Sequence, residues 1–389
     1  MLWHLGDRAQ YRGRHGADTP PHPDTRRAKG TKGTKGKTRC TYPWPEPFYQ
    51  VRVAPTPLSP MKVTLVLTVL NEGESISALL DSVCAQTCLP DEIVVCDGGS
   101  RDDTVGILRR ETRLPIRVIE APGANISRGR NLAIAAASHD VIACTDAGVR
   151  LDACWLEKLV EGLVGHDQDR AMPAGAVAGF FMPDPRSTFE VAMSATVLPL
   201  LEEIKPAAFL PSSRSVAFTK AAWQAVGRYP EWLDYCEDLI FDLKLRQHVG
   251  AFTFAPDAIA YFRPRGTLGA FFKQYYRYAR GDGKASLFLK RHLIRYATYW
   301  LALPLLIAGV ILLSPVLKVA CGLALVGGAA AYVRQPYRRL KRLAQTLAPK
   351  ERRNAAFLVP VIRVTGDIAK MLGYPAGVWW RWKNKAWRS

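Results

Sequence analysis

The chain has 389 residues, 48% of them hydrophobic and 22% charged, which is ordinary for a globular enzyme with room for two domains. Its net charge of +19 comes mainly from residues 1–60, with 11 Lys and Arg against four Asp and Glu, and from residues 334–353, with eight against one. This distribution, in a sequence without zinc-finger spacing or a recognition-helix pattern, argues against a nucleic-acid partner.

Residues 1–60 are rich in Arg, Lys, Gly, Thr and Pro and include the low-complexity run KGTKGTKGKT. A segment of this composition cannot build a hydrophobic core, so we expect a disordered basic N-terminal extension. It contains no apolar stretch of signal-peptide length. Met61 stands two residues before the first predicted strand, and we expect the folded domain to begin there.

From Val63 onward, apolar runs of strand length alternate with helical patterns. The predicted strands are Val63–Val69, Glu92–Cys96, Ile116–Glu120 and Val141–Cys144, and the predicted helices are Glu74–Gln86, a helix ending near Arg110, and Ser127–Ser138. Strands that alternate with helices at this spacing indicate βαβ units and a mostly parallel α/β sheet of Rossmann type, flanked by helices. The stretch from Leu151 to Pro264 is more mixed.

Single acidic residues follow these strands. Asp97 ends the second predicted strand, Asp146 follows the fourth, and Glu237 and Asp238 precede an amphipathic helix. Ligands of open parallel sheets bind outside the carboxyl ends of the strands, so we expect these carboxylates to converge. For Asp97, an N-cap of the following helix is the structural alternative, and for the Glu237-Asp238 pair it is an acidic first helical turn.

Two arginines, Arg128 and Arg130, stand at the start of the helix predicted over Ser127–Ser138. Basic side chains oppose the helix dipole, which favours acidic groups at the N-terminus. An anionic diphosphate nearby would make their position favourable. A solvated basic turn is the alternative.

Two long uncharged segments follow the mixed region. Tyr296–Leu313 has no charged residue, and Val316–Val333 has only Lys318. Each would extend roughly 27 Å as a helix, close to a bilayer core of about 30 Å. Basic residues flank both outer ends, which favours a membrane hairpin with cytoplasmic termini over a buried helical hairpin. After it we predict a basic loop over 334–353 and an interfacial helix over 354–382.

Between Val63 and Ala285 the chain resembles a family 2 glycosyltransferase of the membrane-anchored bacterial type, with the nucleotide-diphospho-sugar transferase (GT-A) fold. The resemblance implies that Thr68, Asn71, Glu72, Asp97, Arg130 and Asp146 bind the nucleotide sugar. Asp146-Ala147-Gly148 stands where the family has its D-x-D metal motif, and Gly148 replaces the second aspartate. A divalent ion, Mg²⁺ or Mn²⁺, is therefore expected at Asp146 with one ligand missing.

The resemblance also assigns the acceptor side. Asp238 matches the family's general base and Glu237 its acidic neighbour, and on a helix the two side chains point about 100° apart. Gln274, Arg277 and Tyr278 resemble the family's Q-x-x-R-W motif, with Tyr in place of Trp, and should contact acceptor sugar and diphosphate from one helical face. An amphipathic interfacial helix is the alternative for this segment.

These features predict three parts: the extension 1–60, a GT-A catalytic domain over 61–285, and a membrane region over 286–389. The expected enzyme is an inverting glycosyltransferase of hexosyltransferase type at the cytoplasmic face of the membrane, in cell-envelope polysaccharide biosynthesis. Its expected partners are a nucleotide-sugar donor such as a UDP-sugar, a lipid-linked or glycan acceptor, and membrane lipids. A catalytically inactive membrane scaffold and a sugar-phosphate nucleotidyltransferase are the alternatives.

Overall fold

The computed structural model describes residues 61–164 and 175–384, so the predicted N-terminal extension lies outside the described residues. One eight-stranded sheet forms its centre, in the order β3-β2-β1-β4-β7-β6-β8-β5. The strands are β1 (Val63–Val69), β2 (Glu92–Asp97), β3 (Ile116–Glu120), β4 (Val141–Cys144), β5 (Val149–Leu151), β6 (Ala176–Pro183), β7 (Val216–Thr219) and β8 (Thr253–Phe262). Only β7 and β5 pair exclusively antiparallel, so the sheet is mostly parallel, as predicted.

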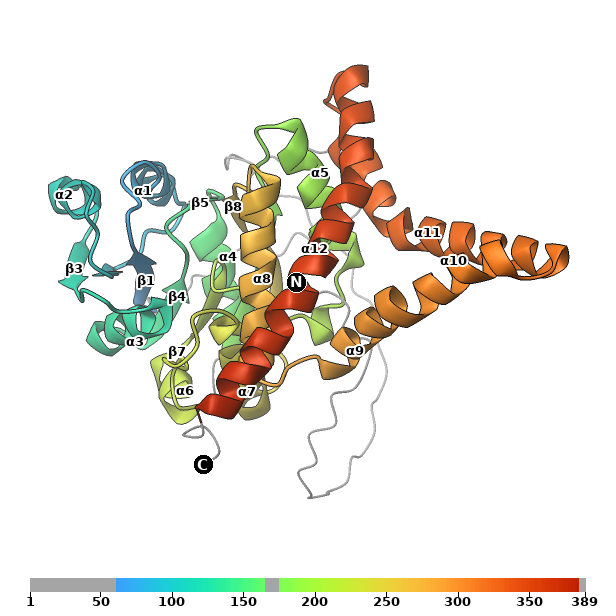
Figure 1. The fold of residues 1–389 in the computed structure, drawn as a ribbon. Coiled ribbons are helices and arrows are strands. Elements are labelled where there is room, and N and C mark those ends of the chain that lie inside the picture. The colour runs from blue at the N-terminus through green and yellow to red at the C-terminus, as the bar shows by residue number, and fades with distance from the viewer. Residues whose placement is uncertain (1–60, 165–174, 385–389) are drawn as a thin grey trace, which may run out of the picture.

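Helices cover both faces of this sheet (Figure 1). They are α1 (Ile76–Cys84), α2 (Thr104–Arg110), α3 (Ile126–Ala136), α4 (Trp155–Val164), α5 (Thr188–Val197), α6 (Lys220–Ala225) and α7 (Glu237–Val249). Alternate side chains of β1 enter different cores. Leu65 and Leu67 pack with α1 and α4, whereas Val66 packs with α3, α6 and α7. Burial on both faces explains why this strand reads as a continuous apolar run.

The carboxyl ends of three strands meet at one edge of the sheet. Val69 of β1 lies beside Asp97 of β2, and Val66 lies beside Cys144 of β4. The loops that follow β1, β2 and β4 therefore emerge together, as the acidic strand ends predicted. Helix α3 starts at this edge, where the Asn125 side chain accepts a hydrogen bond from the backbone N–H of Arg128 at 2.9 Å.

The C-terminal part consists of helices only. They are α8 (Leu268–Lys284), α9 (Leu289–Ala297), a π-helical turn (Thr298–Ala302), α10 (Leu303–Leu312), α11 (Pro315–Leu343) and α12 (Pro349–Lys383). Two continuous helical stretches, Leu289–Leu312 and Pro315–Leu343, are long and apolar enough to cross a membrane. Their apolar windows are 6% and 0% buried, and α10 and α11 project from the body as a hairpin (Figure 1). The alternative of a buried hairpin is therefore wrong.

Two expectations for the C-terminal part need correction. The basic loop predicted over 334–353 is largely helical, because α11 continues to Leu343 and α12 begins at Pro349. Two of the basic residues there form ion pairs with the catalytic part: Arg339 lies 2.8 Å from Glu203, and Arg342 pairs with Glu202.

The helix predicted over 354–382 is present within α12, but it is not separate from the catalytic part. Helix α12 runs back along α8 (Figure 1) and shares a third hydrophobic core with α5, α8 and α11. That core includes Phe271 and Tyr275 of α8 and Val359 and Ile362 of α12. A boundary at 285 would therefore cut through a packed layer and expose the apolar face of α8.

Glycines allow α8 and α12 to pack with their backbones in contact. A Cβ added at Gly377 would lie 2.1 Å from the carbonyl oxygen of Arg280, and one at Gly373 would lie 2.2 Å from that of Tyr276. Backbone atoms cannot rotate away as a flexible side chain can. Any larger residue at these positions must push the two helices apart.

We expect Gly377→Ala to lower the melting temperature of the full chain in detergent, because overpacking costs about 1–3 kcal/mol. Gly328→Ala is the matched control, since an added Cβ there meets nothing within 4 Å. The control should melt at or slightly above the temperature of the parent, because Ala favours a helix over Gly. Equal melting of all three proteins would contradict the close packing of α8 on α12.

Candidate active site

A cavity of about 480 Å³ lies between the sheet edge, α5, α7 and α8. Seven of the residues singled out from the sequence line it: Arg130, Asp146, Glu237, Asp238, Gln274, Arg277 and Tyr278. They come from three separate segments of the chain, residues 130–146, 237–238 and 274–278, which the fold brings to one cavity. Apolar side chains of β6 and α5, among them Phe181 and Met193, also line the cavity.

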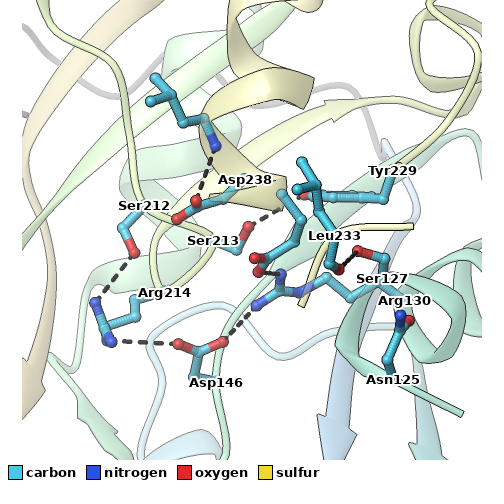
Figure 2. Close-up of polar contacts among 12 residues, drawn as sticks. Asn125, Ser127, Arg130, Asp146, Ser212, Ser213, Arg214, Tyr229, Leu233 and Asp238 are labelled. Atoms are coloured by element: carbon cyan, nitrogen blue, oxygen red, sulfur yellow. Dashed lines mark hydrogen bonds and ion pairs between the residues drawn. The ribbon is translucent and has the colours of Figure 1, made fainter. Parts of the chain in front are cut away.

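A buried guanidinium connects the two acidic segments of the cavity. Arg130 is 3% exposed, and it donates to Oδ1 of Asp146 at 2.8 Å and to Oε1 of Glu237 at 2.9 Å. Figure 2 shows Asp146 between Arg130 and Arg214. Burial lowers the pKa of Arg130, but the two carboxylates outweigh burial and raise it above its ordinary value. The arginine predicted at the start of α3 is thus an internal cation rather than a solvated turn residue.

Sequence reasoning did not single out Arg214. Its Nε lies 3.4 Å from Oδ2 of Asp146. Strand β7 pairs antiparallel with β4, and Val216 opposes Cys144, so two residues farther along position 214 comes opposite Asp146. A basic residue just before a strand was the available signal, but its meaning depends on a pairing between strands about 70 residues apart.

The acidic pair opens α7 after a strained residue. Cys236 has φ +67°, in the left-handed region, which costs a non-glycine residue about 1–2 kcal/mol. Its thiol donates to the backbone carbonyl of Tyr278 and faces Asp282, each at 3.4 Å, and these contacts hold the start of α7 against α8. Strain of this kind at a cavity wall is typical of functional sites.

Glu237 and Asp238 have different partners, as their helical spacing predicted. Glu237 pairs with Arg130, whereas Asp238 accepts a hydrogen bond from the backbone N–H of Leu239 at 2.8 Å. In the described part of the chain, Asp238 has no ion-pair partner within 4 Å. Burial raises the pKa of Glu237 to about 7, with the charge of Asp238 adding to the effect and Arg130 opposing it. Burial likewise raises the pKa of Asp238.

Gln274, Arg277 and Tyr278 face the cavity from one side of α8, as their spacing predicted. Nε2 of Gln274 donates to the Tyr278 hydroxyl at 2.9 Å, and Nη1 of Arg277 donates to the Tyr235 hydroxyl at 2.7 Å. The Oε1 atom of Gln274 is buried without a hydrogen-bond partner among the described residues. A buried acceptor left open in a cavity wall is a position that a ligand donor can fill.

The four remaining predicted nucleotide residues do not line this cavity. Asp97 is 2% exposed, and its carboxylate accepts from the backbone N–H groups of Gly99 (2.9 Å) and Ser100 (3.0 Å) within its own loop. Asn71 accepts from the backbone N–H of Arg101 at 2.8 Å. Asp97 is thus not the N-cap of the following helix α2, because that position belongs to Asp103. Its oxygens instead accept from the loop that it opens, and the binding role stays a prediction.

Thr68 and Glu72 hold the same edge of the sheet together. The backbone N–H of Glu72 donates to the Thr104 hydroxyl at 2.8 Å, and the Glu72 carboxylate accepts from Ser75. The methyl group of Thr68 packs below Gly129, where an added Cβ would approach it to 2.9 Å. Gly129 therefore lets α3 come close enough to β1 to place Arg130. For both residues, contact with a nucleotide stays a prediction.

Comparison with known proteins gives this site a family. Residues 64–181 match Glycosyl transferase family 2. Over 228 residues the chain is 22% identical to the O-antigen chain rhamnosyltransferase RfbN of Salmonella typhimurium, covering 56% of this chain and 71% of that protein. Over 234 residues it is 27% identical to the succinoglycan biosynthesis protein ExoA of Rhizobium meliloti, covering 57% and 68%. The chain thus contains a family 2 glycosyltransferase segment, and it is a glycosyltransferase.

The fold of this glycosyltransferase is the expected GT-A fold. Its structure is similar to that of the mannosyltransferase PcManGT from Pyrobaculum calidifontis in complex with GDP-Man and Mn²⁺, with a TM-score of 0.52 and 19% identity. The similarity covers 82% of this chain and 89% of that one. At this level of identity the likeness shows the fold alone.

The residues of the glycosyltransferase site do not fit the expected divalent ion. Both carboxylate oxygens of Asp146 face guanidinium groups, and Gly148 offers no side-chain ligand. Within residues 61–164 and 175–384, His, Cys, Asp and Glu form no group of three that could hold a metal. Mg²⁺ and Mn²⁺ need several oxygen ligands, and here arginines surround the one predicted carboxylate.

We expect Arg130→Met to lower the stability of the glycosyltransferase by about 3 kcal/mol, because it leaves Asp146 and Glu237 without their shared cation. Arg128→Met on the same turn of α3 is the control, since Arg128 is exposed. Thermal unfolding of both variants in detergent measures the difference. If Arg130→Met melted with Arg128→Met, the buried ion pairs would not be holding the site together.

Proposed function

We propose that the enzyme transfers a sugar, with inversion, from a nucleoside-diphosphate donor, taken to be a UDP-sugar, to a lipid-linked or polysaccharide acceptor. The observation that carries this proposal is the position of Asp238. Its carboxylate lines the cavity at the start of α7, as does Tyr278 of α8. Glu237 forms an ion pair with Arg130, whereas Asp238 has no ion-pair partner among the described residues. Names of relatives in O-antigen and succinoglycan synthesis support an envelope polysaccharide as the product class.

The proposed reaction is a single displacement. The Asp238 carboxylate takes the proton of an acceptor hydroxyl, whose oxygen forms a bond to the anomeric carbon while the bond to the diphosphate breaks. The nucleoside diphosphate leaves with the electron pair, and the anomeric centre is inverted. A raised pKa makes Asp238 a stronger base, and burial without an ion-pair partner is the physical cause of the raised value. The expected Mg²⁺ or Mn²⁺ has no role in this proposed step, because both carboxylate oxygens of Asp146 already face guanidinium groups.

The acceptor is proposed to lie along α8. Tyr278 and Tyr275 present aromatic rings at the cavity wall, and the open Oε1 of Gln274 can accept from a sugar hydroxyl. Apolar side chains of α5 also line the cavity, and α5 packs on α11 at the base of the hairpin. An acceptor carried by a lipid would therefore reach the cavity from the hairpin side.

The hairpin is proposed to cross the cytoplasmic membrane twice, with the catalytic part in the cytoplasm. Arg291 and Arg295 lie near its start, Arg334 and Arg338 lie near its end, and the Ser314-Pro315 turn carries no charge. Positive residues are retained on the cytoplasmic side, so both ends of the hairpin belong there. The exposed apolar surface of α10 and α11 supports contact with lipid.

Asp238→Asn tests the proposed base. The amide keeps the shape of the carboxylate but cannot accept the acceptor proton, so turnover should fall by about 10²–10⁴-fold. Nucleotide binding, measured by titration calorimetry, should stay near that of the parent. Glu237→Gln should be milder, because Glu237 holds Arg130 rather than the acceptor.

The alternatives give different results in the same experiment. If a folded Asp238→Asn protein kept transfer within a few-fold of the parent, Asp238 would not be the base. An inactive scaffold predicts that the parent releases no nucleoside diphosphate from any nucleotide sugar. A nucleotidyltransferase predicts pyrophosphate as the product instead.

The membrane proposal predicts that the full chain stays with the membrane after carbonate extraction. It also predicts that a membrane-impermeant maleimide added to intact cells labels Ser314→Cys at the tip of the hairpin. Arg338→Cys at the cytoplasmic end should react only after the cells are opened, and the parent chain measures the background from its own cysteines. Labelling of both positions in intact cells would contradict the proposed topology.

A further inference from the structure

Arg214 is fixed on three sides and keeps donors for a ligand. Its Nε faces Asp146, its Nη1 donates to the Ser212 hydroxyl at 3.2 Å, and its guanidinium lies over the Phe262 ring at 4.7 Å. A guanidinium has five N–H donors, and the contacts to Asp146, Ser212 and the Tyr278 hydroxyl do not use all of them. The side chain is 26% exposed and lines the cavity.

The backbone places this cation at the motif in which a metal ligand is missing. Because β7 pairs with β4, Arg214 lies opposite Asp146, the first residue of the D-x-D position. The third residue, Gly148, is exposed and carries no carboxylate. A Cβ added at Gly148 would meet nothing within 4 Å, so packing does not impose glycine there. The chain therefore has a guanidinium beside Asp146 and no second acidic ligand.

The charge of the cavity favours an anionic ligand. Five cations line it, Arg130, Arg214, Arg265, Lys273 and Arg277, against the four carboxylates of Asp146, Asp234, Glu237 and Asp238. Asp234 is already paired outside the lining with Arg280 at 3.3 Å and Lys284 at 3.1 Å. Among the described residues, Arg265, Lys273 and Arg277 have no ion-pair partner within 4 Å. The cavity thus holds uncompensated positive charge without any added ion.

We infer that Arg214, held in place by Asp146, supplies at the donor diphosphate the positive charge that a divalent cation would supply, so that the donor binds without metal. A planar guanidinium suits this role because its parallel N–H groups match two phosphate oxygens. Asp146 is then a positioning residue for two arginines and not a metal ligand. The inference rests on the proposed transfer reaction, since it takes the donor to be a nucleoside diphosphate.

Binding of UDP, GDP and dTDP to the full chain in detergent tests this inference directly. Titrations are made in EDTA and in Mn²⁺. The parent should bind one of these nucleotides in EDTA with a Kd within about two-fold of that in Mn²⁺. Arg214→Gln should weaken that binding about 10-fold to 100-fold in EDTA, the effect of losing a charge-assisted hydrogen bond. Arg263→Gln is the matched control, because Arg263 pairs with Glu190 and lies outside the cavity lining.

Two further arms sharpen the result. Arg214→Lys keeps the positive charge but lacks the parallel N–H groups of the guanidinium. Its affinity for the nucleotide should therefore lie between that of the parent and that of Arg214→Gln. Melting curves check that each variant is folded. The nucleoside that corresponds to the best-bound nucleotide lacks the diphosphate, so its binding should not change in Arg214→Gln. Gly148→Asp completes the D-x-D motif, and its nucleotide affinity should become stronger in Mn²⁺ than in EDTA.

Three outcomes would overturn the inference. They are loss of nucleotide binding by the parent in EDTA, unchanged binding by folded Arg214→Gln, and an equal loss of nucleoside and nucleotide binding in that variant. Each is an equilibrium measurement that needs no turnover. Failure here is therefore distinct from failure of the proposed reaction, which the turnover of Asp238→Asn decides.

Discussion

The site depends on one buried guanidinium. Arg130 lies near the start of α3 and donates both to Asp146 after β4 and to Glu237 at the start of α7. It thereby connects a strand end of the sheet with a helix that packs on the sheet. Removal of the arginine would leave Asp146 and Glu237 without their shared cation, which is far more costly than the net gain of the intact pairs. The interaction therefore restricts how α3, β4 and α7 can move relative to each other, and it separates Glu237, which is neutralised, from Asp238, which is not. The proposed roles of Glu237 and Asp238 differ because Arg130 forms an ion pair with Glu237 and not with Asp238.

Helix α8 faces two environments at once. One side presents Gln274, Arg277 and Tyr278 to the cavity, and the other buries Phe271 against α5, α11 and α12. The catalytic and C-terminal parts are thus joined through a hydrophobic layer and not through a flexible linker. Interfaces that bury apolar side chains and bring backbones into contact move as units. The position of the cavity wall that α8 forms is consequently set by helices that lie beyond the family 2 segment, which ends at residue 181.

Local pattern predicted the first four strands, β1 to β4, because they are short, largely apolar runs that end in polar loops, whereas β5 to β8 in the mixed region were not predicted. Asp146 was found by its place after such a run, and Glu237 and Asp238 by their place before an amphipathic helix. Arg214 was not found, since its role arises from the antiparallel register of β7 on β4, and no local pattern encodes which strand lies next to which. The docking of α12 was missed for a related reason. Its apolar positions are interrupted by Pro360, Pro375 and several basic residues, so the sequence resembles an interfacial helix until its partner α8 is known. Asp97 was singled out, but its sequence context does not reveal its role. An aspartate that accepts hydrogen bonds from its own loop and one that binds a nucleotide can follow the same strand pattern.

The return of α12 onto α8 also sets an order of assembly. Ribosomes deliver the chain from its N-terminus, so α8 emerges before the hairpin and α12 emerges after it. Until the last helix has been made, the face of α8 that carries Phe271 and Tyr275 lacks the part of its cover that α12 provides, and the glycines at 373 and 377 that permit close packing are absent. The packing of α8 is therefore completed only after α10, α11 and α12 have been synthesised. A shortened chain that ends before α12 is not expected to have a stable cavity, even though it contains every cavity-lining residue.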